Sequence, residues 1–179
     1  MKIAINGFGR IGRLVFRLME EDNYFDIVAI NDLSTPEELA YLLKYDTNHR
    51  NYNKEITYDE ENIIIEGKKV RVYKEMDPTN LPWKELEIDL VFECTGKFTK
   101  EAMKHVTAGA KKVLVSAPCK GNVKTVVYNV NDDILDDSDK IVSAASCTTN
   151  CLAPVLKLVD DNFCIIKGFM TTIHAYTND

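Results

Sequence analysis

Two cysteines, Cys147 and Cys151, stand four positions apart where an apolar run over residues 140–145 meets a second one. Three interpretations fit this spacing: a disulfide or metal pair, two buried structural thiols, or one activated nucleophile beside a bystander. A metal site needs further ligands, and neither cysteine has a histidine or a second cysteine pair nearby, so no metal is expected. The five cysteines are an odd number without a C-x-x-C pair, which favours reduced thiols over a disulfide.

The position of Cys147 favours a nucleophile. It follows a strand pattern and begins a helical one, where unpaired amides and the helix dipole stabilise a thiolate and could hold an oxyanion. A buried thiol remains the alternative, because free cysteines are often buried. Among three histidines, His49 lies in a polar loop and His105 on a helix with a surface pattern. His174 is the candidate base, and a structural strand histidine is its alternative.

A glycine-rich pattern of the form G-x-G-x-x-G consists of Gly7, Gly9 and Gly12. It follows a short apolar strand and opens an amphipathic helix at Arg10 and Ile11, as in sites that hold a pyrophosphate at a helix N-terminus. Asp32 ends the next strand pattern, where a carboxylate binds a ribose hydroxyl and repels a 2′-phosphate. The pattern therefore predicts NAD binding in preference to NADP. An ordinary glycine turn with a strand-end acid is the alternative.

Alternating strand and helix patterns predict the elements that position these residues. Strands are expected at residues 2–7, 26–32, 89–96, 111–118, 125–130, 140–146 and 164–179, with a hairpin of short strands over 55–73. Helices are expected from Arg10, over 34–46 with Ser34 or Thr35 as its cap, over 99–110 and over 147–160. This order predicts an α/β fold with a doubly wound, mostly parallel sheet of the Rossmann type.

Bulk composition excludes several classes of protein. The 179 residues are 45% hydrophobic and carry a net charge of −6, with Lys and Arg scattered along the chain. Neither a nucleic-acid partner nor a membrane partner is expected. No apolar run approaches the roughly 18 residues of a membrane helix, and the start of the chain lacks a secretory pattern. A cytoplasmic protein is therefore expected.

Several motifs together resemble one family. "INGFGRIGR", "ASCTTNCLAP" and "HAYTND", in this order, closely resemble phosphorylating glyceraldehyde-3-phosphate dehydrogenases, and "ECTGKFT", "VSAP" and "DPTNLPW" fit the same family. The resemblance covers the whole chain. It implies a dinucleotide-binding domain over residues 1–146 and, over 147–179, the beginning of an incomplete α+β catalytic domain. It also implies a glycolytic enzyme that is a homotetramer.

The resemblance implies a role for each matching residue. Cys147 would be the nucleophile, His174 its base and Cys151 a non-catalytic cysteine. The NAD site would contain Gly7, Gly9, Arg10, Ile11, Gly12, Asp32, Met76, Thr95 and Ser116. The substrate site would contain Ser146, Cys147, Thr148 and Thr177. Met76 stands where the family often has Arg, so a backbone contact would survive there and a guanidinium contact would not.

The implied reaction oxidises glyceraldehyde 3-phosphate through a Cys147 thioester, which inorganic phosphate attacks to give 1,3-bisphosphoglycerate. The chain ends about halfway through the usual family length, so we expect the isolated 179 residues to have little activity. Two alternatives stay open. One is a related dehydrogenase acting on erythrose 4-phosphate or aspartate semialdehyde, although "SCTTN" and the Asp32–Leu33 pair favour the triose enzyme. The other is a simple NAD-binding module.

Overall fold

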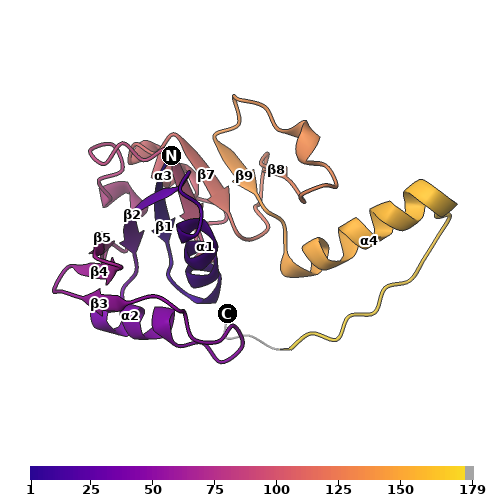
Figure 1. Ribbon diagram of the computed structural model, residues 1–179. Helices are drawn as coiled ribbons and strands as arrows, with labels where there is room; N and C mark the ends of the chain where they lie inside the picture. Colours follow the sequence, from indigo (N-terminus) through magenta and orange to yellow (C-terminus); the bar gives the residue numbers. More distant parts are fainter. Residues whose placement is uncertain (176–179) are drawn as a thin grey trace.

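A computed structural model describes residues 1–175, and a nine-stranded sheet runs through them (Figure 1). The strands are β1 (Lys2–Asn6), β2 (Asp26–Asn31), β3 (Ile56–Tyr58), β4 (Asn62–Ile65), β5 (Lys68–Tyr73), β6 (Leu90–Glu93), β7 (Lys112–Val115), β8 (Lys124–Thr125) and β9 (Ile141–Ser143). Their order is β3-β4-β5-β2-β1-β6-β7-β9-β8, and only the pairs β3–β4 and β4–β5 among them are antiparallel. The predicted mostly parallel α/β fold is confirmed.

Helices cover both faces of this sheet. α1 (Arg10–Glu20) and α2 (Pro36–Lys44) lie on one face, and α3 (Met103–Thr107) lies on the other. A further helix, α4 (Cys147–Phe163), does not pack on the sheet, and short 3-10 turns lie at Pro78–Asn80 and Asp132–Ile134. One hydrophobic core lies under α1 and α2 and includes Phe16 and Leu43. A second core lies on the opposite face, around Trp83 and the residues next to α3. Helices on both faces are the usual cover of a parallel sheet.

The alternation of side chains along the strands explains the two cores. Ile3 and Ile5 of β1 point into the core under α1, whereas Ala4 between them points into the core around Trp83. In β2, Ile30 belongs to the first core and Ala29 to the second. Small alanines on the second face leave room for the large indole, which is fully buried.

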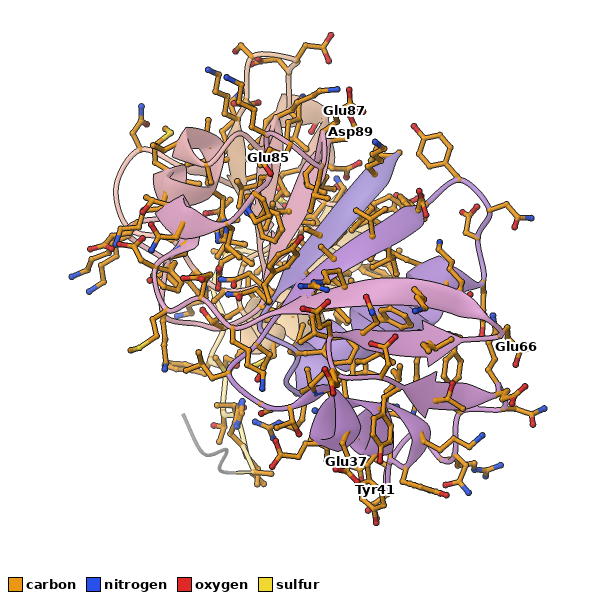
Figure 2. The ribbon with its side chains drawn as sticks, turned by 90° about the vertical axis from the view of Figure 1, so that its left-hand side faces the viewer. Glu37, Tyr41, Glu66, Glu85, Glu87 and Asp89 are labelled. Carbon is orange, nitrogen blue, oxygen red and sulfur yellow. The ribbon has the colours of Figure 1, made fainter. Side chains whose placement is uncertain are left out.

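The start of α2 shows why its sequence forms a helix at that place. The hydroxyl oxygen of Thr35 accepts a hydrogen bond from the backbone N–H of Glu38, and the carboxylate of Glu38 accepts one from the backbone N–H of Thr35. This reciprocal capping box satisfies two donors that the first turn would leave unpaired. Figure 2 shows Glu37 and Tyr41 on the outer side of α2, and both are exposed.

Two predicted elements are much shorter in the structure. The helix expected over residues 99–110 contains only α3, and His105 in it is fully buried, so its assignment to a surface face was wrong. Its ring has partners distant in sequence, Trp83 and Glu93, which hold it inside. The strand expected over 125–130 is reduced to β8, because the side chain of Asn131 bonds to the backbone of Thr125 and Val127 and forms a turn.

The strand expected over residues 164–179 is not present in the described part of this range, residues 164–175, which has no regular secondary structure. A strand needs a neighbour for its backbone hydrogen bonds, and none of the strands in residues 1–175 pairs with this segment. Figure 1 shows α4 extending away from the sheet and the following segment, in yellow, running back below the helix without joining the sheet. No residue of α4 is buried.

Candidate active site and dinucleotide cavity

A cavity of about 360 Å³ lies at the carboxyl ends of β1, β2 and β6. Its lining consists of Asn6, Gly7, Gly9, Asn31, Asp32, Leu33, Glu75, Met76, Cys94, Thr95, Lys97 and Phe98. Ligands of open parallel sheets bind at this edge of the strands. The position of the cavity therefore agrees with the dinucleotide site that the glycine pattern predicts.

The glycine turn lets α1 approach the strand closely. Gly7 has a φ of +88°, which favours glycine, and a Cβ atom on Gly12 would lie 2.2 Å from the carbonyl oxygen of Gly7. Gly9 has no atom within 4 Å of a built Cβ and lines the cavity, so its place is open for a ligand. No side chain among residues 1–175 caps the start of α1. The free amides there suit a pyrophosphate, and the site fits a dinucleotide.

The carboxylate of Asp32 is held rigidly beside this turn. Its Oδ2 atom accepts a hydrogen bond from the backbone N–H of Phe8 at 2.8 Å, and its Oδ1 atom accepts one from Ser34 at 3.0 Å. Each carboxylate oxygen has a further lone pair, so the group can still accept hydrogen bonds from ribose hydroxyls. Fixing the carboxylate in advance lowers the entropy that a ribose contact would otherwise cost.

The structure brings together only part of the predicted cofactor site. Gly7, Gly9, Asp32, Met76 and Thr95 line the cavity, whereas Arg10, Ile11, Gly12 and Ser116 do not. The sequence interpretation missed Asn6, Asn31, Glu75, Cys94, Lys97 and Phe98, as well as Leu33 in this role. One signal could have found some of them: polar residues that end apolar parallel strands tend to face the ligand edge.

The thiol of Cys147 lies at the first residue of α4 and contacts the imidazole of His174. The Sγ atom is 3.4 Å from Nε2, and Nδ1 lies 2.7 Å from the carbonyl oxygen of Ala175. Because a carbonyl only accepts, Nδ1 carries the proton and Nε2 is left to accept one from the thiol. This tautomer is the one that a general base needs.

The pKa of the Cys147 thiol is lowered, first by the hydrogen bond to His174 and then by the hydroxyl of Thr148. Burial acts in the opposite direction on two other cysteines: it raises the pKa of Cys94 to about 12 and also raises that of Cys119. Cys147 is exposed, so it is not the buried structural thiol of the alternative interpretation. A lowered pKa and exposure are the two properties of a reactive cysteine.

Cys147 and His174 line a groove together with Thr148, Cys151, Leu152 and residues 170–173. Ser146 serves as the cap of α4, since its hydroxyl accepts a hydrogen bond from the backbone N–H of Thr149. Thr177 lies outside the described residues. This groove shares no lining residue with the dinucleotide cavity, and the roles of Ser146, Thr148 and Thr177 stay predictions.

Residues 1–175 contain no group of three or more His, Cys, Asp or Glu side chains arranged to hold a metal ion. None of their helices combines the length and the apolar character needed to cross a membrane. All five cysteines have free thiols.

The fold and the site together define an α/β dinucleotide-binding protein that carries an exposed thiol beside an imidazole. Residues 1–101 match the family model described as the NAD binding domain of glyceraldehyde 3-phosphate dehydrogenase, and residues 146–179 match that of its C-terminal domain. The chain belongs to the glyceraldehyde-3-phosphate dehydrogenase family, and its cofactor is NAD.

Curated relatives support the same assignment. The chain is 56% identical over 180 residues to glyceraldehyde-3-phosphate dehydrogenase of Clostridium pasteurianum, with 99% of this chain and 54% of the relative covered. It is 55% identical to the enzyme of Clostridium acetobutylicum, with the same coverage of both chains. It is 53% identical over 182 residues to that of Mycoplasma pneumoniae, covering 100% of this chain and 54% of the relative. The chain thus spans about half the length of these relatives.

Proposed function

We propose that this chain contributes the NAD site, the nucleophile and the base of an enzyme that oxidises and phosphorylates glyceraldehyde 3-phosphate in glycolysis. The observation that carries the proposal is the contact between the Cys147 thiol and His174 at the start of α4. It occurs in a chain whose first 101 residues match an NAD binding domain. The relatives that support the substrate are named for this activity, and the chain covers about half of each.

The geometry suits a sequence of steps at one thiol. Nε2 of His174 accepts the thiol proton, and the Cys147 thiolate attacks the aldehyde carbon to form a thiohemiacetal. His174 returns this proton to the former aldehyde oxygen, which gives the hydroxyl of the thiohemiacetal and makes the imidazole a base again. His174 then takes the hydroxyl proton while the carbon–hydrogen bond breaks, and NAD, when bound, would supply the hydride acceptor. The resulting thioester is attacked by inorganic phosphate. The acyl phosphate leaves, and the electron pair of the carbon–sulfur bond returns to Cys147 as thiolate.

The dinucleotide contacts follow from the cavity. The pyrophosphate would lie over Gly7 and Gly9 at the start of α1, where Arg10 and Ile11 offer their backbone N–H groups. Asp32 would bind the ribose on the adenine side. For Met76, Thr95 and Ser116 we retain the contacts that the family motifs imply, with Met76 acting through its backbone. On the substrate side, Ser146, Thr148 and Thr177 are proposed to contact the triose phosphate.

The assembly and location are also proposals. We propose a cytoplasmic homotetramer, because the family motifs imply a tetramer and the reduced thiols fit a reducing compartment. The apolar side chains on α4 and after it, such as Leu158, Phe163 and Phe169, are exposed in residues 1–175 and would need cover in such an assembly. The boundary between the two domains at residues 146 and 147 remains a prediction.

A single-turnover experiment tests the proposal without demanding full turnover from 179 residues. The chain is mixed with NAD and glyceraldehyde 3-phosphate in the absence of phosphate, and NADH absorbance is followed beside mass mapping of the thiols. We expect up to one equivalent of NADH and an acyl group on Cys147. Cys147→Ser should abolish both, and Cys151→Ser should abolish neither. NAD binding without any acylation would instead support a simple NAD-binding module.

Phosphate-dependent turnover is a second measurement on the same samples. We expect steady-state turnover of the isolated chain to be weak, because the chain spans about half the length of its relatives and the family resemblance assigns further phosphate-binding residues to the other half. Replacing the triose phosphate by erythrose 4-phosphate compares the two sugar phosphates directly. A larger acylation yield with erythrose 4-phosphate would shift the assigned substrate to that sugar.

A further inference from the structure

Three polar side chains form a row at the edge of the dinucleotide cavity, on the face of the sheet that packs against Trp83, and the two asparagines among them line the cavity. The three are Asn31 of β2, Asn6 of β1 and Glu93 of β6, which we call the polar ladder. Asn6 is the register partner of Asn31 on one side and of Glu93 on the other. Asn6 and Glu93 are fully buried, and Asn31 is 5% exposed. Buried polar groups at this depth require complete hydrogen bonding.

The hydrogen bonds of the polar ladder run in one direction. The amide nitrogen of Asn31 donates to Oδ1 of Asn6 at 2.7 Å, and the amide nitrogen of Asn6 donates to Oε2 of Glu93 at 2.5 Å. An ionised carboxylate can only accept, so it determines which end of the Asn6 amide faces it. The orientation of Asn6 in turn determines that of Asn31. The carboxylate of Glu93 therefore sets the polarity of the whole row.

His105 and Trp83 support Glu93 from below. The indole Nε1–H donates to Nδ1 of His105 at 3.0 Å, so this ring nitrogen is an acceptor. The proton must then lie on Nε2, which donates to Oε2 of Glu93 at 2.9 Å, while the Asn6 amide lies farther from Nε2, at 3.4 Å. A second proton on Nδ1 would face the indole N–H. The two partners thus select the Nε2–H tautomer of the ring.

Each end of the polar ladder holds one wall of the cavity. Oδ1 of Asn31 accepts from the backbone N–H of Glu75 at 2.8 Å, and its amide nitrogen donates to the Glu75 carbonyl at 2.9 Å. At the other end, Oε1 of Glu93 accepts from the backbone N–H of Thr95 at 2.8 Å and from its hydroxyl. Glu75 and Thr95 both line the cavity, whereas Glu93 does not.

We propose that Glu93 is a positioning residue of the NAD site, which acts through the polar ladder to hold the Glu75 and Thr95 walls at the spacing that the dinucleotide needs. His105 supports this role, because its Nε2–H donates to the Glu93 carboxylate and its Nδ1 accepts from the indole of Trp83. The inference deepens the proposed NAD site and rests on NAD occupying this cavity. Its effect on the walls is measurable without NAD.

The variant Glu93→Gln tests the polarity directly. A glutamine amide must turn its NH₂ group toward either Asn6 and His105 or Thr95, and every one of these faces it with a donor. If it turns toward Asn6, the Asn6 and Asn31 amides have to flip, and the Asn31 nitrogen then faces the N–H of Glu75. Either orientation releases one wall of the cavity. Replacing one buried carboxylate oxygen by an NH₂ group is thus expected to act at the cavity edge.

Backbone hydrogen exchange without nucleotide is the first measurement. In Glu93→Gln we expect exchange at the Glu75 or Thr95 amide, or at both, to rise about tenfold, the change produced by losing about 1.4 kcal/mol of local protection. Amides of β7 serve as the internal reference and should not change. Glu85→Gln is the matched control: Glu85 is exposed and lies near Glu87 and Asp89, as Figure 2 shows, and it should behave like the parent chain. Trp83 is the only tryptophan and is fully buried, so its emission verifies that each variant is folded.

A pair of His105 variants covers the case in which Glu93→Gln does not fold. His105→Gln keeps one donor for Glu93 and one acceptor for the indole, whereas His105→Phe keeps neither. We expect His105→Gln to retain parental exchange at Thr95 and His105→Phe to lose protection there. Nitrogen NMR of the parent should show His105 as the Nε2–H tautomer. Equal behaviour of the two variants, or the opposite tautomer, would overturn the proposal.

Calorimetric titration with NAD is the last measurement on these samples. We expect NAD to bind Glu93→Gln about tenfold more weakly than the parent chain and Glu85→Gln equally well. A folded Glu93→Gln with parental exchange and parental affinity would refute the positioning role while the NAD site stands. If the parent chain did not bind NAD at all, the proposed NAD site would fail instead, and the exchange data would still decide whether Glu93 holds the walls.

Discussion

The Sγ atom of Cys147 lies 3.4 Å from Nε2 of His174, and the two residues are 27 positions apart. Cys147 begins a helix, whereas His174 belongs to a segment without regular structure. The pKa of the thiol is lowered mainly by this contact, which favours the charged sulfur over the neutral one. The contact between the start of α4 and the segment after it is therefore the largest single cause of the lowered thiol pKa.

The first prediction concerns the pH dependence of alkylation. Because the pKa of Cys147 is lowered, its reaction with iodoacetamide should reach half of its maximal rate below the ordinary thiol value of 9.0. His174→Ala removes the main cause, so the midpoint should move up toward that value. Mass mapping of the five cysteines across the pH range measures the alkylation midpoint of Cys147 in the parent chain and in His174→Ala.

Cys94 and Cys119 provide the comparison within the same experiment. Burial raises the pKa of both thiols, so they should react last near neutral pH. Modification of Cys151 before Cys147, or a common rate for all five cysteines, would contradict the lowered pKa. An unchanged midpoint in His174→Ala would show that the start of α4 alone activates the thiol.

The second prediction concerns the choice between NAD and NADP. The carboxylate of Asp32 can bind ribose hydroxyls and repels a 2′-phosphate, so the chain should bind NAD more tightly. Asp32→Ala should reduce this preference by about 1–3 kcal/mol, the size of a lost charged hydrogen bond. Calorimetric titration of both cofactors measures it, with Asp133→Ala as a control at an exposed acid. Equal affinity of the parent chain for both cofactors would disprove this role of Asp32.

The third prediction separates two glycines of the G-x-G-x-x-G pattern, Gly9 before α1 and Gly12 within it. Gly12→Ala places a Cβ atom 2.2 Å from the Gly7 carbonyl oxygen, so it should destabilise the fold. Gly9→Ala meets no protein atom within 4 Å, and the φ of Gly9 is −72°, so the chain should fold normally. Its methyl group enters the cavity, however, and NAD binding should weaken about tenfold or more. Thermal unfolding and NAD titration of both variants distinguish these effects. An equal loss of thermal stability in Gly9→Ala and Gly12→Ala would contradict the prediction.

The fourth prediction concerns the cap of α2. Thr35→Ala removes the acceptor for the Glu38 N–H and should lower the free energy of unfolding by about 1 kcal/mol. Glu38→Gln keeps one acceptor oxygen for Thr35 and should cost clearly less. Urea unfolding followed by Trp83 emission measures the free energy of unfolding of both variants. The loss of the cap should affect this free energy, because α2 packs on the core through the buried Leu39 and Leu43. Equal losses in the two variants would mean that the Thr35 hydroxyl is not the main cap.

The elements whose signals are local could be predicted from the sequence. Gly7, Gly9 and Gly12 lie within six residues that lead from the end of β1 into the first turn of α1, and Asp32 directly follows β2. The cap at Thr35 also depends on neighbours only three positions away. Each of these signals lies within a short window of the sequence. The glycine turn, the β-α-β order and the place of Asp32 could therefore be predicted from the sequence alone.

Features that depend on distant partners could not be predicted in this way. His105 has charged neighbours such as Lys104, which indicates a surface, but its ring is held by Trp83, 22 positions away, and by Glu93, 12 positions away. The apolar residues after 164 favour a strand only if another strand pairs with them, which local propensity does not reveal. Glu75 likewise lines the cavity through its backbone hydrogen bonds with the side chain of Asn31, which is 44 positions away.

The absence of buried residues in α4 has a consequence for cooperativity. A helix that shares no buried surface with the sheet gains little stability from it, and α4 also contains Pro154, which removes one helical hydrogen bond. In the described chain α4 should therefore melt as its own unit, at a lower temperature than the sheet. The Cys147–His174 contact would then disappear while the glycine turn and Asp32 are still in place. A mild rise in temperature should silence the thiol chemistry first and leave nucleotide binding intact.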